Sequence, residues 1–134
     1  MILFSLPYPP SLNSLFRNAG YGEKSRKRKP TLRYLTWLRA ATNEVQAQSI
    51  GQRSISGPIK ILLTCGRPDK RKRDVTNLLK ACEDLMVRTG MIEDDHLTEA
   101  ALIQWGDVQG CEIRIWPAAD VSFRAVEFAE TRAA

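Results

Sequence analysis

Residues 74–90, DVTNLLKACEDLMVRTG, carry the clearest helical pattern in the chain. Their apolar side chains recur at spacings of three and four, which places them on one face of an α-helix. Asp74 is a natural N-cap and Gly90 a natural stop, so the pattern predicts a helix over residues 75–89. The apolar face consists of Val75, Leu78, Leu79, Cys82, Leu85 and Met86.

Strand patterns lie on both sides of this helix, and a second helix precedes it. Four runs read as strands: residues 2–6, 58–65, 98–105 and 111–116. Residues 106–110, with a glycine at either end, predict a hairpin between the last two strands. Residues 31–48 carry apolar side chains near helical spacing, with Thr31 as the expected cap. The order β-α-β-α-β-β favours an α+β fold of two layers, a mixed sheet with the helices on one face.

Length and composition limit what the chain can be. With 134 residues and 43% hydrophobic content, residues 1–134 are expected to form a single domain with a buried core. No apolar run approaches the roughly 18 residues of a membrane span, and no secretory signal is visible, so we expect a cytoplasmic protein without a membrane partner. The three widely spaced cysteines fit a reducing compartment, and a single histidine, His96, excludes multi-histidine metal sites. Residues 118–134 are ambiguous, either a short terminal element or a frayed tail.

Positive charge is concentrated in two blocks and negative charge in one. Residues 17–39 carry eight bases and one acid, and residues 67–73 carry five bases and one acid. Residues 83–99 reverse this, with six acids and one base. At a net charge of +5, the basic blocks suit a polyanion and the acidic block suits a cation. Residues 17–30, basic and poor in apolar side chains, predict a mobile loop.

Polar side chains on the helix and on the turn after it could carry chemistry. Asn77, Lys80 and Asp84 share a helical face distinct from the apolar one, and Asp74 lies one turn earlier. Three consecutive acids follow at residues 93–95, and the connection is short enough to fold back over the helix. Carboxylates so close together repel one another unless a hard cation such as Mg²⁺ binds. The alternative is a solvated helix face and an ordinary acidic turn.

Hydrolysis of a phosphodiester would use both the acids and the bases. Carboxylate-held magnesium makes water nucleophilic and neutralises phosphate charge. A lysine such as Lys80 can stabilise the developing negative charge or assist proton transfer. The flanking bases would hold the remaining backbone phosphates.

Three short motifs follow one another along the chain. The first, PPSLN at residues 9–13 followed by Arg17, resembles the P-P-S-x-N motif of the RusA family of Holliday-junction resolvases. RPDKRKRD at residues 67–74, then NL at 77–78 and KA at 80–81, resembles its basic run and R-D-x-D-N-L-x-K-A segment. GMIEDD at residues 90–95 resembles its G-x-x-x-D-D turn. Order and spacing agree over roughly residues 7–116.

This resemblance implies a homodimeric, magnesium-dependent endonuclease, with Mn²⁺ as a substitute ion. It would bind branched double-stranded DNA and resolve four-way junctions by paired symmetric nicks, in recombination and repair. By position, the resemblance makes Asp74 and Asp95 metal-binding catalytic acids and Lys80 the catalytic lysine, with Asp94 as a further metal ligand. Thr76, Asn77 and Asp84 would lie near the site. The DNA-binding candidates are Asn13, Arg17, Lys24, Arg26, Lys27, Arg28, Lys29, Arg67, Lys70, Arg71, Lys72 and Arg73.

The chain departs from the family pattern at Thr76, which stands where the family usually has a second acid. A neutral hydroxyl is a poorer magnesium ligand than a carboxylate, so metal affinity should fall. Asp84 or Glu93 could compensate. The alternative is a protein that binds branched DNA and cuts slowly or not at all. A third reading, an enzyme acting on small phosphorylated molecules, is disfavoured because a small phosphate needs few cations.

Overall fold

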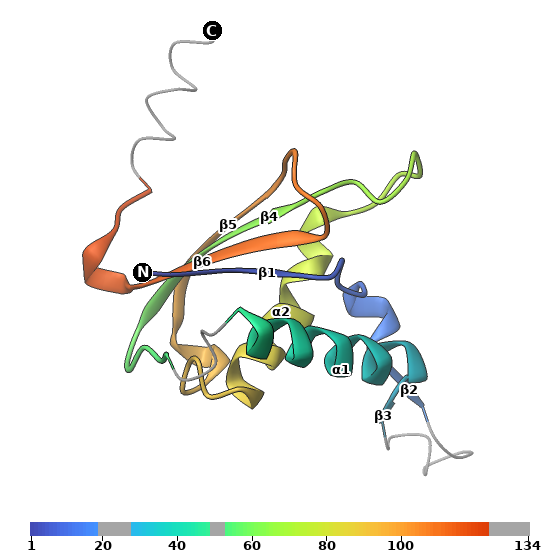
Figure 1. Cartoon of the computed structure of the whole chain (residues 1–134), viewed down its shortest axis with the longest axis horizontal. Coiled ribbons are helices and arrows are strands. Elements are labelled where there is room, and N and C mark those ends of the chain that lie inside the picture. The colour runs from blue at the N-terminus through green and yellow to red at the C-terminus, as the bar shows by residue number, and fades with distance from the viewer. Residues whose placement is uncertain (19–27, 49–52, 124–134) are drawn as a thin grey trace, which may run out of the picture.

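The computed structural model describes residues 1–18, 28–48 and 53–123, and its main element is a four-stranded sheet (Figure 1). The strands are β1 (Ile2–Leu6), β4 (Ile59–Cys65), β5 (Thr98–Trp105) and β6 (Cys111–Pro117). They are arranged in the order β1-β6-β4-β5, with β4 and β5 parallel and the other two pairs antiparallel. The predicted α+β class with a mixed sheet is confirmed.

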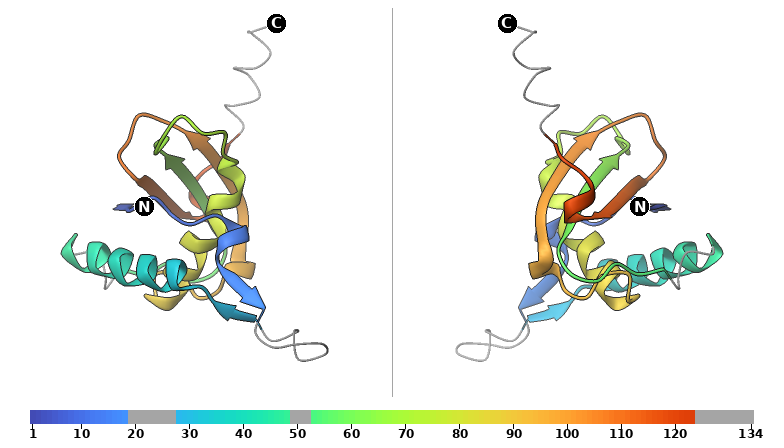
Figure 2. Two further views of the ribbon diagram at one scale, coloured as in Figure 1. Left: turned by 90° about the vertical axis from the view of Figure 1, so that its right-hand side faces the viewer. Right: turned by 90° about the vertical axis from the view of Figure 1, so that its left-hand side faces the viewer.

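Two helices cover one face of this sheet (Figure 2). They are α1 (Leu32–Ala47) and α2 (Leu79–Arg88), the latter preceded by a 3₁₀ turn, η3 (Val75–Leu78). Every second residue of β1, β4 and β6 is buried on the covered face and joins the core. Fully burying one such aliphatic side chain stabilises the fold by about 1.5–3 kcal/mol, so this alternation fixes which face the helices cover.

The predicted N-terminus is confirmed for one helix and wrong for the other. Thr31 caps α1 as predicted, because its Oγ1 accepts from the Tyr34 backbone N–H at 3.2 Å. Asp74 occupies the capping position of η3, but its side chain makes no capping hydrogen bond. The predicted single helix from residue 75 is therefore wrong. The Asn77 N–H reaches the Asp74 carbonyl at 3.1 Å, which makes a tighter turn, and α2 begins only at Leu79.

The predicted hairpin between residues 98–105 and 111–116 is also wrong, because β4 lies between β5 and β6. Cys65 at the end of β4 pairs with Trp105 on one side and Cys111 on the other. Parallel strands need a long crossover, and here η3 and α2 supply it between β4 and β5. The candidate site residues from 74 to 95 all belong to this one crossover.

The described residues of the expected loop at residues 17–30 form part of a small ribbon. β2 (Phe16–Asn18) pairs antiparallel with β3 (Arg28–Pro30). The ribbon is anchored because the Phe16 ring packs edge-on against Tyr34 and the Thr31 N–H donates to the Leu15 carbonyl at 2.9 Å. The predicted DNA-binding residues Lys24, Arg26 and Lys27 lie outside the described residues, as does most of the C-terminal tail beyond the 3₁₀ turn Ala118–Asp120.

Two further observations bear on the class of protein. No helix in the described ranges combines the length and apolar character that crossing a membrane requires. The three cysteines are buried and unpaired with one another. A hydrogen bond to Cys111, together with burial, raises the pKa of the Cys65 thiol, which makes that thiol a poor nucleophile.

Candidate active site

Two hollows in the surface are lined by the candidate acids Asp74, Asp84, Asp94 and Asp95. The larger, about 470 Å³, is lined by Pro9, Pro10, Asn13, Asp74 and Asn77, among others. The smaller, about 300 Å³, is lined by residues of β2, α1, α2 and the turn that follows α2. The candidate acids are divided between them: Asp74 faces the larger hollow, whereas Asp84, Asp94 and Asp95 face the smaller one.

Lys80 joins the helix to the acidic turn. Its Nζ lies 2.5 Å from Asp95 Oδ2 and 3.1 Å from Asp84 Oδ1. The turn after α2 therefore folds back over the helix, as the sequence predicted for Asp94 or Asp95. The hydrogen bond that Lys80 donates to Asp95, with a further one that it donates to Asp84, raises the pKa of Lys80, and the same lysine lowers the pKa of Asp95. The Lys80 and Asp95 side chains are 38% and 35% exposed, so a large substrate can reach this ion pair.

Tyr34 is a functional candidate that the sequence analysis missed. Its hydroxyl donates to Asp84 Oδ2 at 2.9 Å, and the residue is fully buried. Burial, reinforced by the Asp84 carboxylate, raises the pKa of the Tyr34 hydroxyl, so it stays protonated as a donor. No local signal marks Tyr34, because its partner lies 50 positions further along the chain.

Asp74 belongs to the wall of the larger hollow, with Lys72 and Arg73 beside it. The side chain of Asp74 is exposed and makes no capping bond. Arg73 is paired with Asp69, with 2.7 Å between Arg73 Nη2 and Asp69 Oδ2, which lowers the pKa of Asp69 to about 2. The basic loop therefore contains one internal ion pair, and its other bases, Arg67, Lys70, Arg71 and Lys72, are exposed.

The chemistry of these donors fits a hard cation. Within the described ranges, no cysteine or histidine lines either hollow, and the acids offer carboxylate oxygens, which suit magnesium or manganese. Among residues 1–18, 28–48 and 53–123, no three His, Cys, Asp or Glu side chains are grouped so that they could hold a metal ion. Asp94 pairs with His96 at 3.3 Å. Thr76 supplies no carboxylate, and Glu93 accepts from the Gly57 N–H at 2.8 Å.

Comparison with known proteins identifies the family. Residues 7–116 match the model of the endodeoxyribonuclease RusA family. The chain belongs to the RusA family. Crossover junction endodeoxyribonuclease RusA of Enterobacteria phage HK97 is 30% identical over 96 residues, 69% of this chain and 72% of the relative. The enzymes of the same name from Escherichia coli K12 and Enterobacteria phage 82 are 30% and 32% identical over 92 residues, 68% of this chain and 71% of each relative. The resemblance drawn from the motifs is confirmed.

The three RusA motifs meet around η3 and α2. The P-P-S-x-N motif lines the larger hollow with Pro9, Pro10 and Asn13. The segment from Arg73 to Ala81 forms η3 and the start of α2. Its Asn77 lines the same hollow, whereas its Lys80 pairs with Asp95, which lines the smaller hollow. The D-D turn supplies Asp94 and Asp95. Segments far apart in the sequence thus gather at one helix.

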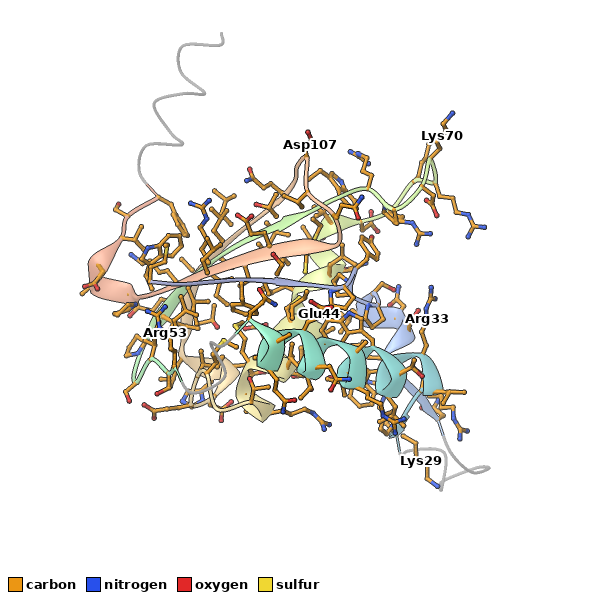
Figure 3. The ribbon with its side chains drawn as sticks, in the orientation of Figure 1. Lys29, Arg33, Glu44, Arg53, Lys70 and Asp107 are labelled. Atoms are coloured by element: carbon orange, nitrogen blue, oxygen red, sulfur yellow. The ribbon has the colours of Figure 1, made fainter. Side chains whose placement is uncertain are left out.

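The described bases of the predicted DNA-binding set lie at one end of the molecule. Figure 3 shows Lys29, Arg33 and Lys70 on the same side, away from Arg53. Arg17, Arg28 and Lys29 belong to the β2–β3 ribbon, whereas residues 67–73 form the loop after β4. The Arg28 guanidinium lies 5.4 Å from the centre of the Phe16 ring, and that of Arg67 lies 4.5 Å from the Trp105 ring. Arg33, in the first turn of α1, and Lys72, in the loop after β4, both line the larger hollow, so bases from two separate elements border it.

Proposed function

We propose that this protein is a magnesium-dependent endonuclease that resolves four-way DNA junctions by paired symmetric nicks during recombination and repair. The observation that carries the proposal is the meeting of three RusA motifs around α2, with Lys80 paired to Asp95 at an accessible surface. Relatives that cover more than two thirds of the chain are named crossover junction endodeoxyribonucleases. Branched double-stranded DNA is accordingly the proposed substrate.

Each group in the site has a proposed role. Asp74, in the larger hollow, and Asp95 with Asp94, in the smaller one, are the proposed Mg²⁺ ligands, and a single ion shared by all three would require the two hollows to close on it. The bound ion would supply a nucleophilic water and neutralise phosphate charge. Lys80 stays charged because two carboxylates accept from its ammonium. It can therefore donate to an oxygen on which negative charge develops as the phosphodiester bond breaks. Asn13 and the bases around the larger hollow would hold flanking phosphates.

A homodimer would suit such a substrate. Two copies related by a two-fold axis present two active sites, and the same two-fold axis would relate the two DNA strands to be cut. The two basic segments of each copy would hold the DNA arms next to its own site.

The test is cleavage of a synthetic four-way junction by the purified full chain. We expect paired nicks at symmetric positions that stop when a chelator removes magnesium and return with Mg²⁺ or Mn²⁺. A linear duplex of the same length is the control, and it should stay intact. Tight junction binding without nicks would favour the non-catalytic binding protein that Thr76 makes conceivable, and preference for a nucleotide over the junction would favour a small-molecule enzyme.

Restoring an acid at position 76 should strengthen metal binding. Thr76 is exposed on η3, two residues after Asp74. An added carboxylate there increases the charge available to a divalent cation, so Thr76→Asp should lower the half-saturating magnesium concentration for cleavage roughly tenfold. Thr76→Asn is the matched control, because asparagine has the size of aspartate but no charge, and it should leave the magnesium dependence unchanged. Equal curves for the two variants would place position 76 outside the metal shell.

A further inference from the structure

We infer that Tyr34 and Asp84 form a positioning pair that holds Lys80 at the proposed catalytic site. The inference rests on the proposed function, since it concerns how the proposed catalytic lysine is kept in place. A lysine ammonium sits at the end of a flexible four-carbon stem and loses considerable rotamer freedom when it is fixed. A catalytic lysine on an exposed helix face therefore needs partners that define its position.

Asp84 is such a partner, and both of its carboxylate oxygens are engaged. Oδ1 accepts from Lys80 Nζ at 3.1 Å, one helical turn away on α2. Oδ2 accepts from the Tyr34 hydroxyl at 2.9 Å. Contacts on both oxygens from two different helices fix the plane of the carboxylate, so the face that Asp84 presents to Lys80 is defined.

Tyr34 is a rigid donor because its surroundings fix its ring. The side chain is fully buried, its ring lies edge-on to Phe16 at 5.7 Å between centroids, and it stacks on Trp37 at 6.5 Å. Its backbone belongs to the capped first turn of α1. Phe16 belongs to the β2–β3 ribbon, so the basic ribbon packs directly against the ring that holds Asp84.

A second acid beside Lys80 matters because Asp95 has two tasks. Asp95 accepts from Lys80 in this structure and is also a proposed metal ligand. A carboxylate shared with a cation holds an ammonium less firmly, since the two positive charges repel each other. Asp84, fixed by Tyr34 and outside the proposed ligand set, keeps Lys80 in position independently of what Asp95 binds.

The experiment measures single-turnover cleavage of a four-way junction and junction affinity separately. We expect Asp84→Asn to slow cleavage roughly 10–100-fold, the usual cost of losing a group that orients a site residue. Tyr34→Phe removes one hydrogen bond and should slow it about 2–12-fold. Junction Kd should be unchanged in both. Thr98→Val is the matched control: it removes the hydroxyl that donates to Glu83 Oε2 at 2.9 Å on the same helix, and cleavage should keep its wild-type rate.

A second comparison separates positioning from a general loss of structure. If Asp84 and Tyr34 act through Lys80, neither substitution should slow cleavage further in a Lys80→Ala background. The inference would be overturned if either substitution slowed cleavage in the Lys80→Ala background by the same factor as in the wild type. Wild-type cleavage rates in both single variants would also overturn it.

A readout that does not depend on cleavage separates this inference from the proposed function. If the wild type does not cut junctions at all, the proposed function fails while the pair remains testable by NMR. The inference predicts that the ¹H–¹⁵N signal of the Lys80 ammonium, which Asp95 still binds, shifts in Asp84→Asn and in Tyr34→Phe and keeps its wild-type position in Thr98→Val. A signal that does not move in Asp84→Asn would count against the pair.

Discussion

Asp95→Asn is expected to reduce junction cleavage by roughly 10³-fold, the scale of losing a principal electrostatic group from an active site. Two effects add up in this variant. The amide is a weaker magnesium ligand than the carboxylate. Lys80 also loses the nearer of its two acidic partners, at 2.5 Å. Junction Kd should stay within about twofold because the DNA-binding bases are untouched. The measurement is single-turnover nicking at saturating magnesium, with binding followed in parallel without the metal.

Asp120→Asn makes the same chemical change away from the proposed site. Asp120 ends the 3₁₀ turn after β6, at the opposite end of the molecule from Lys70 (Figures 1 and 3). Its cleavage rate should match the wild type. An Asp95→Asn protein that cuts normally would show that the acidic turn after α2 is not where the chemistry occurs.

Neutralising Lys70, Arg71, Lys72 and Arg73 together should give the largest loss of binding. In a plot of log affinity against log salt concentration, each phosphate contact makes the downward slope steeper by about 0.9. Losing four contacts should therefore make the slope shallower by about 3.6. At 0.15 M salt the same relation gives a loss of affinity of up to about 10³-fold. The measurement is junction Kd by fluorescence anisotropy at several salt concentrations, for the wild type and for the variant with glutamine at all four positions.

A pair of double variants separates the position of the charge from its amount. Lys70→Gln with Arg71→Gln removes one lysine and one arginine from the loop after β4. Arg53→Gln with Lys60→Gln removes the same charges elsewhere, and Figure 3 shows Arg53 far from Lys70. Only the first pair should flatten the salt slope. Equal slopes for the two pairs would mean that net charge, and not this loop, attracts the DNA.

Local patterns in the sequence were enough to predict most of the fold. The alternation of Ile59, Ile61 and Leu63 predicts a strand, and β4 buries these three side chains. The Thr31 cap and the Gly90 stop are likewise local signals, and Gly90 has the positive φ of 76° that ends a helix in this way. Such signals depend on neighbours within a few residues, which is why they can be recognised before the fold is known.

Pairing between distant segments could not be predicted in the same way. Glycines at both ends of residues 106–110 suggested a hairpin, but the insertion of β4 between β5 and β6 depends on the crossover through α2. The ribbon at residues 16–18 and 28–30 was missed because it is stabilised by Phe16 packing on Tyr34, a contact that no local pattern encodes.

In the candidate site, too, contacts within one segment could be predicted and contacts between distant segments could not. The row of Lys80 and Asp84 follows from helical spacing, and the short connection to Asp95 limits where that acid can lie. Tyr34 comes from a different helix, so its contact with Asp84 could only be found in three dimensions. The separation of Asp74 from Asp95 into two hollows was not predicted either, and the capping pattern at Asp74 did not reveal the 3₁₀ turn η3 that follows it.

The position of β1 has a consequence for how the chain is made. Ile2 pairs with Ile115 and Leu6 with Cys111, so β1 joins β6, which follows it by more than a hundred residues. A ribosome adds about 5–20 residues per second, and therefore roughly 5–20 s pass between synthesis of the two strands. During this interval β1, with Ile2, Phe4 and Leu6 on its apolar side, lacks the strand with which it pairs. Completion of the sheet is thus a late event of biosynthesis, and chaperones that shield nascent chains have a defined segment to protect.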